Sequence, residues 1–162
     1  MSGDGEHILL KYTPQSSVYL LFSKDSSVPI WDTSVWTSYS SSISGDGNYL
    51  AYSHYDSYDN SLITLRDTST GLAIMSGEFS QDSDELVESI SLSYDGKYIA
   101  LGERVQGQKI YVLQKNSSTP LWSYDVGGQA QVKVSEDTAR RGRLYAQVAQ
   151  EQRFLYRRCI AR

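Results

Sequence analysis

The chain has 162 residues, of which 40% are hydrophobic and 21% are charged, and its formal net charge is −4. These values are typical of a folded domain with its own core and exclude a disordered chain. A single cysteine, Cys159, excludes an internal disulfide framework and a zinc site built from several cysteines. No apolar run approaches the roughly 20 residues of a membrane-spanning helix, so we expect no membrane span.

The charges are distributed unevenly along the chain. Residues 1–134 carry 8 Lys and Arg against 16 Asp and Glu, whereas residues 135–162 carry 7 Arg against 3 acidic residues. Because duplex binding depends on basic side chains that neutralise phosphates, we do not expect nucleic acid as a partner of the acidic part. We interpret the basic end as a solvated strand face, with anion binding as the alternative.

A short turn recurs along the chain. SGDG at 2–5 returns as SGDG at 44–47, as SYDG at 93–96 and as a degenerate SEDT at 135–138. The turn aspartates are spaced by 42, 49 and 42 residues, and a basic residue follows each of them after twenty residues. The aspartates are Asp4, Asp46, Asp95 and Asp137, and the basic residues are Lys24, Arg66, Lys115 and Arg157.

These markers divide the chain into repeats 2–43, 44–92 and 93–134 and a partial repeat, 135–162. Each repeat is predicted to contain four short strands, which in the first are EHILLKY, SVYLLFS, a strand around PIW and the serine-rich SYSSSIS. Asp-Gly between two strands favours a tight hairpin, because glycine accepts a positive φ. We expect the aspartates to stabilise these turns by bonding their own backbone rather than to bind calcium.

A four-stranded repeat of this length predicts a blade of a β-propeller, whose period is roughly 40–50 residues. The predicted fold class is therefore all-β, with blades of four antiparallel strands. The serine-rich strand is expected to be innermost, because blades converge on the axis and only small side chains fit there. Apolar residues on both faces of the other strands indicate sheets that are packed on both sides.

The repeat resembles that of a known family. S-x-D-G-x-Y-[IL]-A, followed by a [VI]-Y-[LV] strand and a P-[IL]-W strand, looks like the WD40-like and quinoprotein (PQQ-type) propeller repeats. LRDTSTG at 65–71 is similar to the Asp-x-x-Thr-Gly turn of the quinoprotein repeat, and the Trp-Asp dipeptide of WD40 repeats occurs once, at Trp31-Asp32. The resemblance implies a propeller, and its quinoprotein branch implies a quinone bound with a metal at the ring's centre. No matching carboxylate and amide cluster is identified, so no cofactor and no metal are predicted.

With the strands named A (inner) to D (outer), the chain runs BCD, ABCD, ABCD and ABC, or about three and a half blades. Closed propellers typically have 4–8 blades. We therefore expect a partial or open propeller whose ring is completed by further blades of a longer chain or by another copy in a homo-oligomer. Its open ends would otherwise expose unpaired edges.

The segment 135–162 permits two interpretations. Leu144, Val148, Leu155 and Cys159 are spaced by 4, 7 and 4 residues, which fits one face of a helix. The interval from Asp137 to Arg157 instead matches the other repeats, which favours a degenerate blade with RLYAQVA as its B strand. We favour the degenerate blade, with the helix as the alternative.

A candidate binding rim follows from the length of the second repeat. Its seven extra residues fall within 76–89, in the connection from strand D to the next strand A. In a meander this connection leaves from the same end of the blade as the B–C loop, residues 54–60. Acidic side chains among tyrosines suit a basic peptide or, less well, a divalent cation, and solvated loop carboxylates are the plainer alternative. The rim residues are Tyr55, Asp56, Tyr58, Asp59, Asp82, Asp84 and Glu85.

Enzyme motifs are scarce, since His7 and His54 are the only histidines and no G-x-S-x-G motif occurs. No catalytic residues are predicted. The favoured function is a non-catalytic propeller segment that acts as a scaffold for a protein or peptide partner through loops on one rim. The alternative is part of a quinoprotein-like or hydrolytic propeller enzyme whose active site lies outside this chain. The compartment stays open between the cytoplasm and, for a piece of an exported protein, the extracellular space.

Overall fold

The computed structural model describes residues 1–13, 16–55, 61–80, 87–103, 109–125, 144–150 and 153–159. Every regular element in these ranges is a β-strand. All strand pairs are antiparallel, and they form sheets of three, four, four and two strands. The predicted all-β class, built from antiparallel blades, is therefore confirmed.

The first two sheets follow the predicted strand order. The first sheet contains β1 (His7–Tyr12), β2 (Ser17–Ser23) and β3 (Pro29–Val35). The second sheet contains β4 (Ser38–Ile43), β5 (Tyr49–Tyr55), β6 (Ser61–Asp67) and β7 (Ala73–Ser80). Neighbours in each sheet are neighbours in sequence, so each sheet is a meander.

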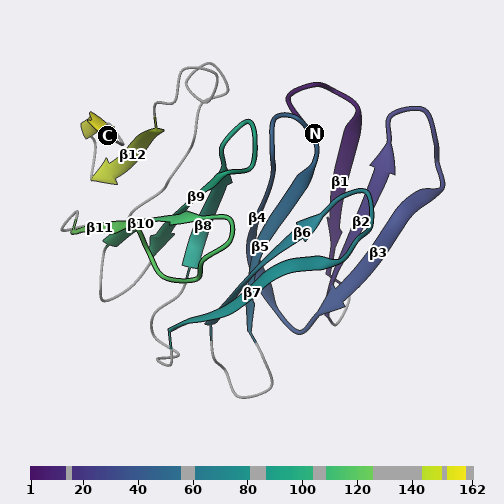
Figure 1. Ribbon diagram of the computed structural model, residues 1–162, viewed down its shortest axis with the longest axis horizontal. Coiled ribbons are helices and arrows are strands. Elements are labelled where there is room, and N and C mark those ends of the chain that lie inside the picture. The colour runs from purple at the N-terminus through teal and green to yellow at the C-terminus, as the bar shows by residue number, and fades with distance from the viewer. Residues whose placement is uncertain are drawn as a thin grey trace.

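The third sheet repeats the second, and the fourth has two described strands. The third sheet contains β8 (Val87–Leu92), β9 (Tyr98–Glu103), β10 (Lys109–Gln114) and β11 (Trp122–Asp125). The fourth sheet contains β12 (Leu144–Gln150) and β13 (Arg153–Cys159). Figure 1 shows the first three sheets side by side in chain order, from purple β1 to green β11.

The helical alternative for the C-terminal segment is wrong. The residues that fit one helical face are cross-strand partners, because Leu144 lies opposite Cys159 and Val148 lies opposite Leu155. Spacings of 4 residues also keep side chains on one face of a strand, whose period is two. The predicted inner strand of this repeat, QAQVKVS at 129–135, lies outside the described residues.

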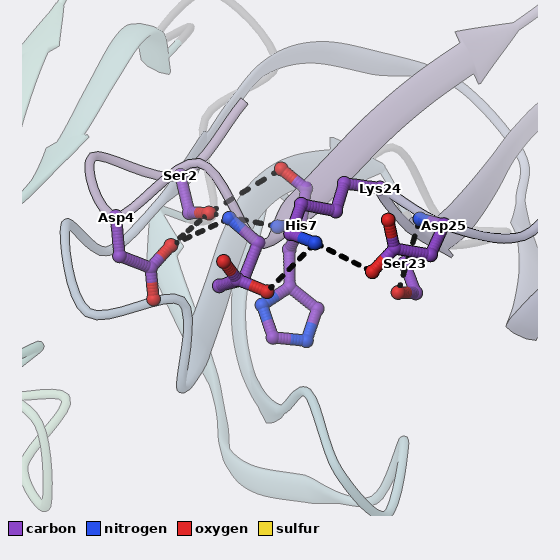
Figure 2. A network of polar contacts seen from close by, with 7 residues as sticks. Ser2, Asp4, His7, Ser23, Lys24 and Asp25 are labelled. Atoms are coloured by element: carbon purple, nitrogen blue, oxygen red, sulfur yellow. Dashed lines mark hydrogen bonds and ion pairs between the residues drawn. The ribbon is translucent and has the colours of Figure 1, made fainter.

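The Asp-Gly turns have the predicted internal bonding. In the first turn the Asp4 carboxylate accepts hydrogen bonds from the Ser2 hydroxyl and from the Glu6 amide, the latter at 3.0 Å (Figure 2). The hydrogen bond from Ser2, followed by that from the Glu6 amide, lowers the pKa of Asp4 below its ordinary value. Asp46 and Asp95 accept the same pair of bonds in their turns. Asp137 lies outside the described residues.

Successive turns are joined by backbone hydrogen bonds. The amide of Asp4 donates to the carbonyl of Gly45 at 2.8 Å, and the amide of Asp46 donates to the carbonyl of Tyr94 at 2.9 Å. Gly45 and Tyr94 hold the same place in their turns, one residue before the aspartate. The repeated turn in the sequence therefore gives the same hydrogen bond between the first and second sheets and between the second and third.

The serine-rich strand β4 lies against β8, the equivalent strand of the next sheet. The hydroxyls of Ser40 and Ser42 accept hydrogen bonds from the amides of Ile90 and Leu92, both at 3.1 Å. A small side chain allows this approach, and its hydroxyl satisfies a backbone donor that the edge of β8 would otherwise leave open. The serine content of this strand is therefore explained by contacts between sheets.

Apolar side chains fill the space on both sides of the second sheet. Leu50 and Tyr52 pack with Tyr19 of the first sheet, whereas Ala51 belongs to a larger cluster shared with the third sheet. Because successive residues of β5 point to opposite faces, one strand serves both interfaces. The larger cluster contains Ala51, Ile63, Leu65, Met75, Val87, Ile90, Leu92, Ile99, Leu101 and Leu113.

The basic residue twenty positions after the turn aspartate connects its sheet to the preceding one. In the second sheet Arg66 donates to the Thr33 hydroxyl of the first sheet at 3.2 Å. In the third sheet Lys115 donates to the Tyr49 hydroxyl of the second sheet at 3.0 Å and lies 4.6 Å from the centre of that ring. This regular spacing therefore reflects a structural contact between sheets.

We predict that Gly96→Ala destabilises the fold more than Gly5→Ala. Both glycines have a positive φ, at 65° and 78°, so each alanine costs about 1 kcal/mol in backbone strain. A Cβ on Gly96 would also lie 2.1 Å from the Tyr49 ring, whereas nothing lies within 4 Å at Gly5. Overpacking of this kind adds about 1–3 kcal/mol. Urea unfolding of the two variants measures the difference, and equal losses would contradict it.

A pH dependence follows from Asp95. Its burial by itself would raise the pKa, but hydrogen bonds from Lys97 and Ser93 and the charge of Lys97 outweigh it, so the pKa is lowered. The ionised carboxylate therefore stabilises the fold above about pH 4 and loses this effect as the pH falls through the lowered value. We expect Asp95→Asn to be less stable than the parent at pH 7 and to approach it below pH 3, as measured by urea unfolding. A gap that persists unchanged at low pH would contradict this assignment.

Candidate binding rim

The candidate rim lies where strands β1 and β5 end and β4 begins. The amide of Tyr55, the last residue of β5, donates to the carbonyl of Thr37 at 2.9 Å. Thr37 belongs to the connection between β3 and β4. The end of a B strand and a D–A connection therefore meet at one end of the sheets, as a meander requires.

The two loops that carry the predicted acidic residues are anchored at this same end. Tyr55 pairs with Ser61 across β5 and β6, and Ser61 pairs with Ser80 across β6 and β7. These three residues border the loops 56–60 and 81–86. Of the predicted rim residues, only Tyr55 is described, and the other six lie outside the described residues. They are Asp56, Tyr58, Asp59, Asp82, Asp84 and Glu85.

Tyr55 contacts an aromatic residue that was not among the predicted rim residues. Its ring meets that of Tyr39 edge to face, with centroids 5.5 Å apart and an interplanar angle of 83°. Tyr39 is 42% exposed, and Trp36, in the connection before it, is 72% exposed. We call Trp36, Thr37, Tyr39 and Tyr55 the aromatic rim. Trp36 and Tyr39 could have been noticed as large aromatics flanking a predicted connection, but their exposure is not readable from sequence.

A chain of polar side chains supports the strand that carries Tyr55. Nε2 of His54 and the hydroxyl of Thr64 share a hydrogen bond of 3.0 Å, and Thr64 and Ser76 share one of 3.1 Å. The chain crosses β5, β6 and β7 in turn. His54 also lies with its ring 5.4 Å from that of Tyr52. These contacts fix the direction of β5 at the point where it reaches the rim.

A second polar group ties the start of β4 to the first sheet. The hydroxyls of Tyr19 and Ser38 share a hydrogen bond, and Lys11 donates to the Ser38 carbonyl. The Ser38 amide donates to the Ser17 hydroxyl at 3.1 Å. Burial raises the pKa of Tyr19, so this phenol stays neutral and keeps its proton for the hydrogen bond. The aromatic rim therefore rests on strand ends that are held from both sheets.

Metal-ligand clusters and membrane-spanning helices are both absent from the described residues. No group of three or more His, Cys, Asp or Glu residues that could hold a metal ion occurs among them. None of them forms a helix long and apolar enough to cross a membrane. His7 and His54 lie in different sheets, at the start of β1 and near the end of β5.

We expect a measurable coupling between Tyr39 and Tyr55. Edge-to-face aromatic pairs contribute about 0.5–1.5 kcal/mol beyond their buried area. A double-mutant cycle of Tyr39→Phe, Tyr39→Ala and Tyr55→Ala, followed by urea unfolding, isolates this term. Tyr39→Phe keeps the ring and should retain the coupling, whereas Tyr39→Ala should remove it. Additive losses for Tyr39→Ala and Tyr55→Ala would contradict the contact.

The architecture is that of known propellers. A scan of protein families and a search of curated proteins found no match to this chain. Among solved structures the chain is similar to the C-terminal WD40 domain of Sif2, with a TM-score of 0.66 and 17% sequence identity. The match covers 91% of this chain and 38% of that one, so the chain spans well under half the length of its structural neighbour. The chain has a WD40-like propeller fold.

Proposed function

We propose that the chain is a non-catalytic propeller segment that binds a protein or peptide partner through the aromatic rim and its acidic loops. The observation that carries the proposal is Trp36, which is 72% exposed in the connection whose next residue, Thr37, accepts a hydrogen bond from the Tyr55 amide. Exposed tryptophan and tyrosine side chains are enriched among the residues that dominate binding energy at interfaces. The polar contacts under the rim support this proposal, because a rigid base reduces the entropy lost on binding.

The charge of the chain indicates what kind of partner fits. Residues 1–134 carry 16 acidic against 8 basic residues, and the sequences of the loops 56–60 and 81–86, which follow the ends of β5 and β7, contain two and three of the acidic ones. Opposite charge speeds association and selects partners, while aromatic contacts supply most of the affinity. A basic peptide with an apolar or aromatic anchor is therefore the partner that we propose.

Three finer features belong to the same proposal. We propose that the four sheets are about three and a half blades, that further blades or another copy complete the ring, and that the repeat is of the quinoprotein type. The DTSTG turn supports the last of these. Asp67 accepts hydrogen bonds from the amides of Ser69 and Thr70, both at 2.9 Å, and the φ of Gly71 is 69°.

Neutralising the acidic loops should weaken binding to basic peptides. The probe is an array of Lys- and Arg-rich peptides that carry one Trp or Leu, and the variant combines Asp56→Asn, Asp59→Asn, Asp82→Asn and Asp84→Asn. We expect the parent to bind best at low salt and the variant to lose at least tenfold in affinity and most of its salt dependence. Trp36→Ala should lower the affinity at every salt concentration.

The control combines Glu6→Gln and Asp25→Asn, which neutralise two acidic groups at the opposite end of the first sheet, and it is compared with a two-site loop variant, Asp56→Asn with Asp59→Asn. Glu6 and Asp25 both contact Lys24 at exposed positions, so the fold should tolerate the control substitutions. We expect this control to bind as the parent does. A loss in the control equal to that of the two-site loop variant would mean that only the overall charge matters, and an unchanged profile in the four-site loop variant would reject the proposed rim.

A further inference from the structure

The turns at 44–47 and 93–96 contain Asp-Gly, a dipeptide that is prone to a spontaneous change of the main chain. The amide nitrogen of the glycine can attack Cγ of the aspartate, because glycine has no side chain to hinder the approach. A C–N bond forms, the carboxyl C–O bond breaks, and the carboxyl hydroxyl leaves with the amide proton as water. Water then opens the cyclic imide at either carbonyl, which restores aspartate or gives isoaspartate.

Isoaspartate in these turns would disrupt the contact between sheets. It carries the main chain through Cβ and Cγ, so the chain becomes longer by one atom between the aspartate and the glycine. The amide of Asp46 donates to the carbonyl of Tyr94 at 2.9 Å, and Gly47 lies close to the first sheet. A lengthened main chain cannot keep both contacts. The arrangement of the sheets therefore requires that these turns stay unmodified.

The attacking nitrogen is already hydrogen-bonded in both turns. The amide of Gly47 donates to the carbonyl of Ser44 at 3.1 Å, and the amide of Gly96 donates to the carbonyl of Ser93 at 3.0 Å. The attack requires this amide to lose its proton, and a hydrogen-bonded proton is lost less readily. The backbone of the turn serine therefore slows the first step of the reaction.

The hydroxyl of the same serine binds the carboxylate that would be attacked. Ser44 donates to Oδ1 of Asp46 at 2.6 Å, and Ser93 donates to Oδ1 of Asp95 at 2.9 Å. In each turn the same oxygen also accepts from the amide two residues farther along. The imide can form only if the carboxylate leaves both donors. Because the serines are 0% and 3% exposed, little water competes for these bonds.

A side chain of the preceding sheet lies against each glycine. A Cβ on Gly47 would lie 2.5 Å from Nδ1 of His7, and a Cβ on Gly96 would lie 2.1 Å from the ring of Tyr49. The two glycines have φ of 72° and 65°. Ring closure requires the Asp-Gly peptide to rotate, and the packed ring beside it opposes this rotation. Contact with the preceding sheet therefore adds to the effect of the serine.

We propose that Ser44 and Ser93 protect Asp46 and Asp95 from conversion to isoaspartate, so that these turns become modification sites only when the contact between sheets opens. The same two hydroxyls accept hydrogen bonds, both at 3.0 Å, from the amides of the first residues of β5 and β9. A serine at this place thus closes the hairpin and protects the peptide bond within it.

The test holds the full chain at physiological temperature and mildly acidic pH and measures isoaspartate at each site by peptide mapping with mass spectrometry. In Ser93→Ala we expect isoaspartate to form about tenfold faster at Asp95, while Asp46 in the same molecule keeps the rate of the parent. Ser44→Ala should reverse this pattern. A loss of overall stability would accelerate both sites equally. That result, or no acceleration at either site, would overturn the proposal.

A second measurement needs no variant that must fold. A capped peptide with the sequence of residues 91–99, SLSYDGKYI, contains the third turn without its neighbouring sheet. We expect Asp95 of the folded parent to form isoaspartate more slowly than this peptide by about tenfold or more, and the parent in urea to match the peptide. A folded parent that reacts as fast as the peptide would by itself contradict the protection.

Discussion

The hydrogen bond that the amide of a turn aspartate, Asp4 or Asp46, donates to the next turn is the contact on which the arrangement of the described sheets depends. It becomes available because the carboxylate of the same residue satisfies the rest of its turn, as Asp46 does with Ser44 and Asn48. The glycine that follows takes a positive φ and leaves room for the side chain of the preceding sheet, His7 at Gly47 and Tyr49 at Gly96. A short turn thereby sets both the hairpin and the distance between sheets.

The inner strands extend this principle along the interface. Serine hydroxyls replace part of the backbone pairing that cannot form between strands of separate sheets. Larger side chains would hold β4 and β8 apart, and apolar ones would leave amides of β8 without an acceptor. Farther from these strands, apolar residues of both sheets fill the space, and Arg66 and Lys115 hold the outer part together. The interface between two sheets therefore has serine contacts at the inner strands, apolar contacts farther out, and the contacts of the basic residues in its outer part.

The two ends of the sheets differ in what they repeat. At the end with the Asp-Gly turns, equivalent residues make the same backbone hydrogen bonds in each described repeat. The residues at this end are therefore needed to maintain the fold. At the opposite end the connections differ in length and composition between repeats, and Trp36 and Tyr39 are exposed there. Residues that hold neighbouring sheets together have little freedom to vary, whereas connections on a rigid scaffold are free to serve binding. The aromatic rim lies at the end that is free in this sense.

Much of the strand layout was predictable, because turn chemistry and a period of two are local properties of the chain. The Asp-Gly turns mark β1, β5 and β9, and the serine-rich segments mark β4 and β8. The C-terminal segment shows the limit, since the spacings of 4 from Leu144 to Val148 and from Leu155 to Cys159 fit one face of a helix and one face of a strand equally well. Pairing across β12 and β13 decided between them, because backbone partners lie outside the local pattern.

At the rim, too, some features follow from the sequence and others only from the tertiary structure. The sequence by itself determined that the B–C and D–A connections share one end, because a meander of antiparallel strands permits no other arrangement. Only the tertiary structure decided that Tyr55 meets Tyr39 and that Trp36 is exposed. Exposure and edge pairing depend on which sheets lie beside a residue, and residues far apart in the chain supply those neighbours.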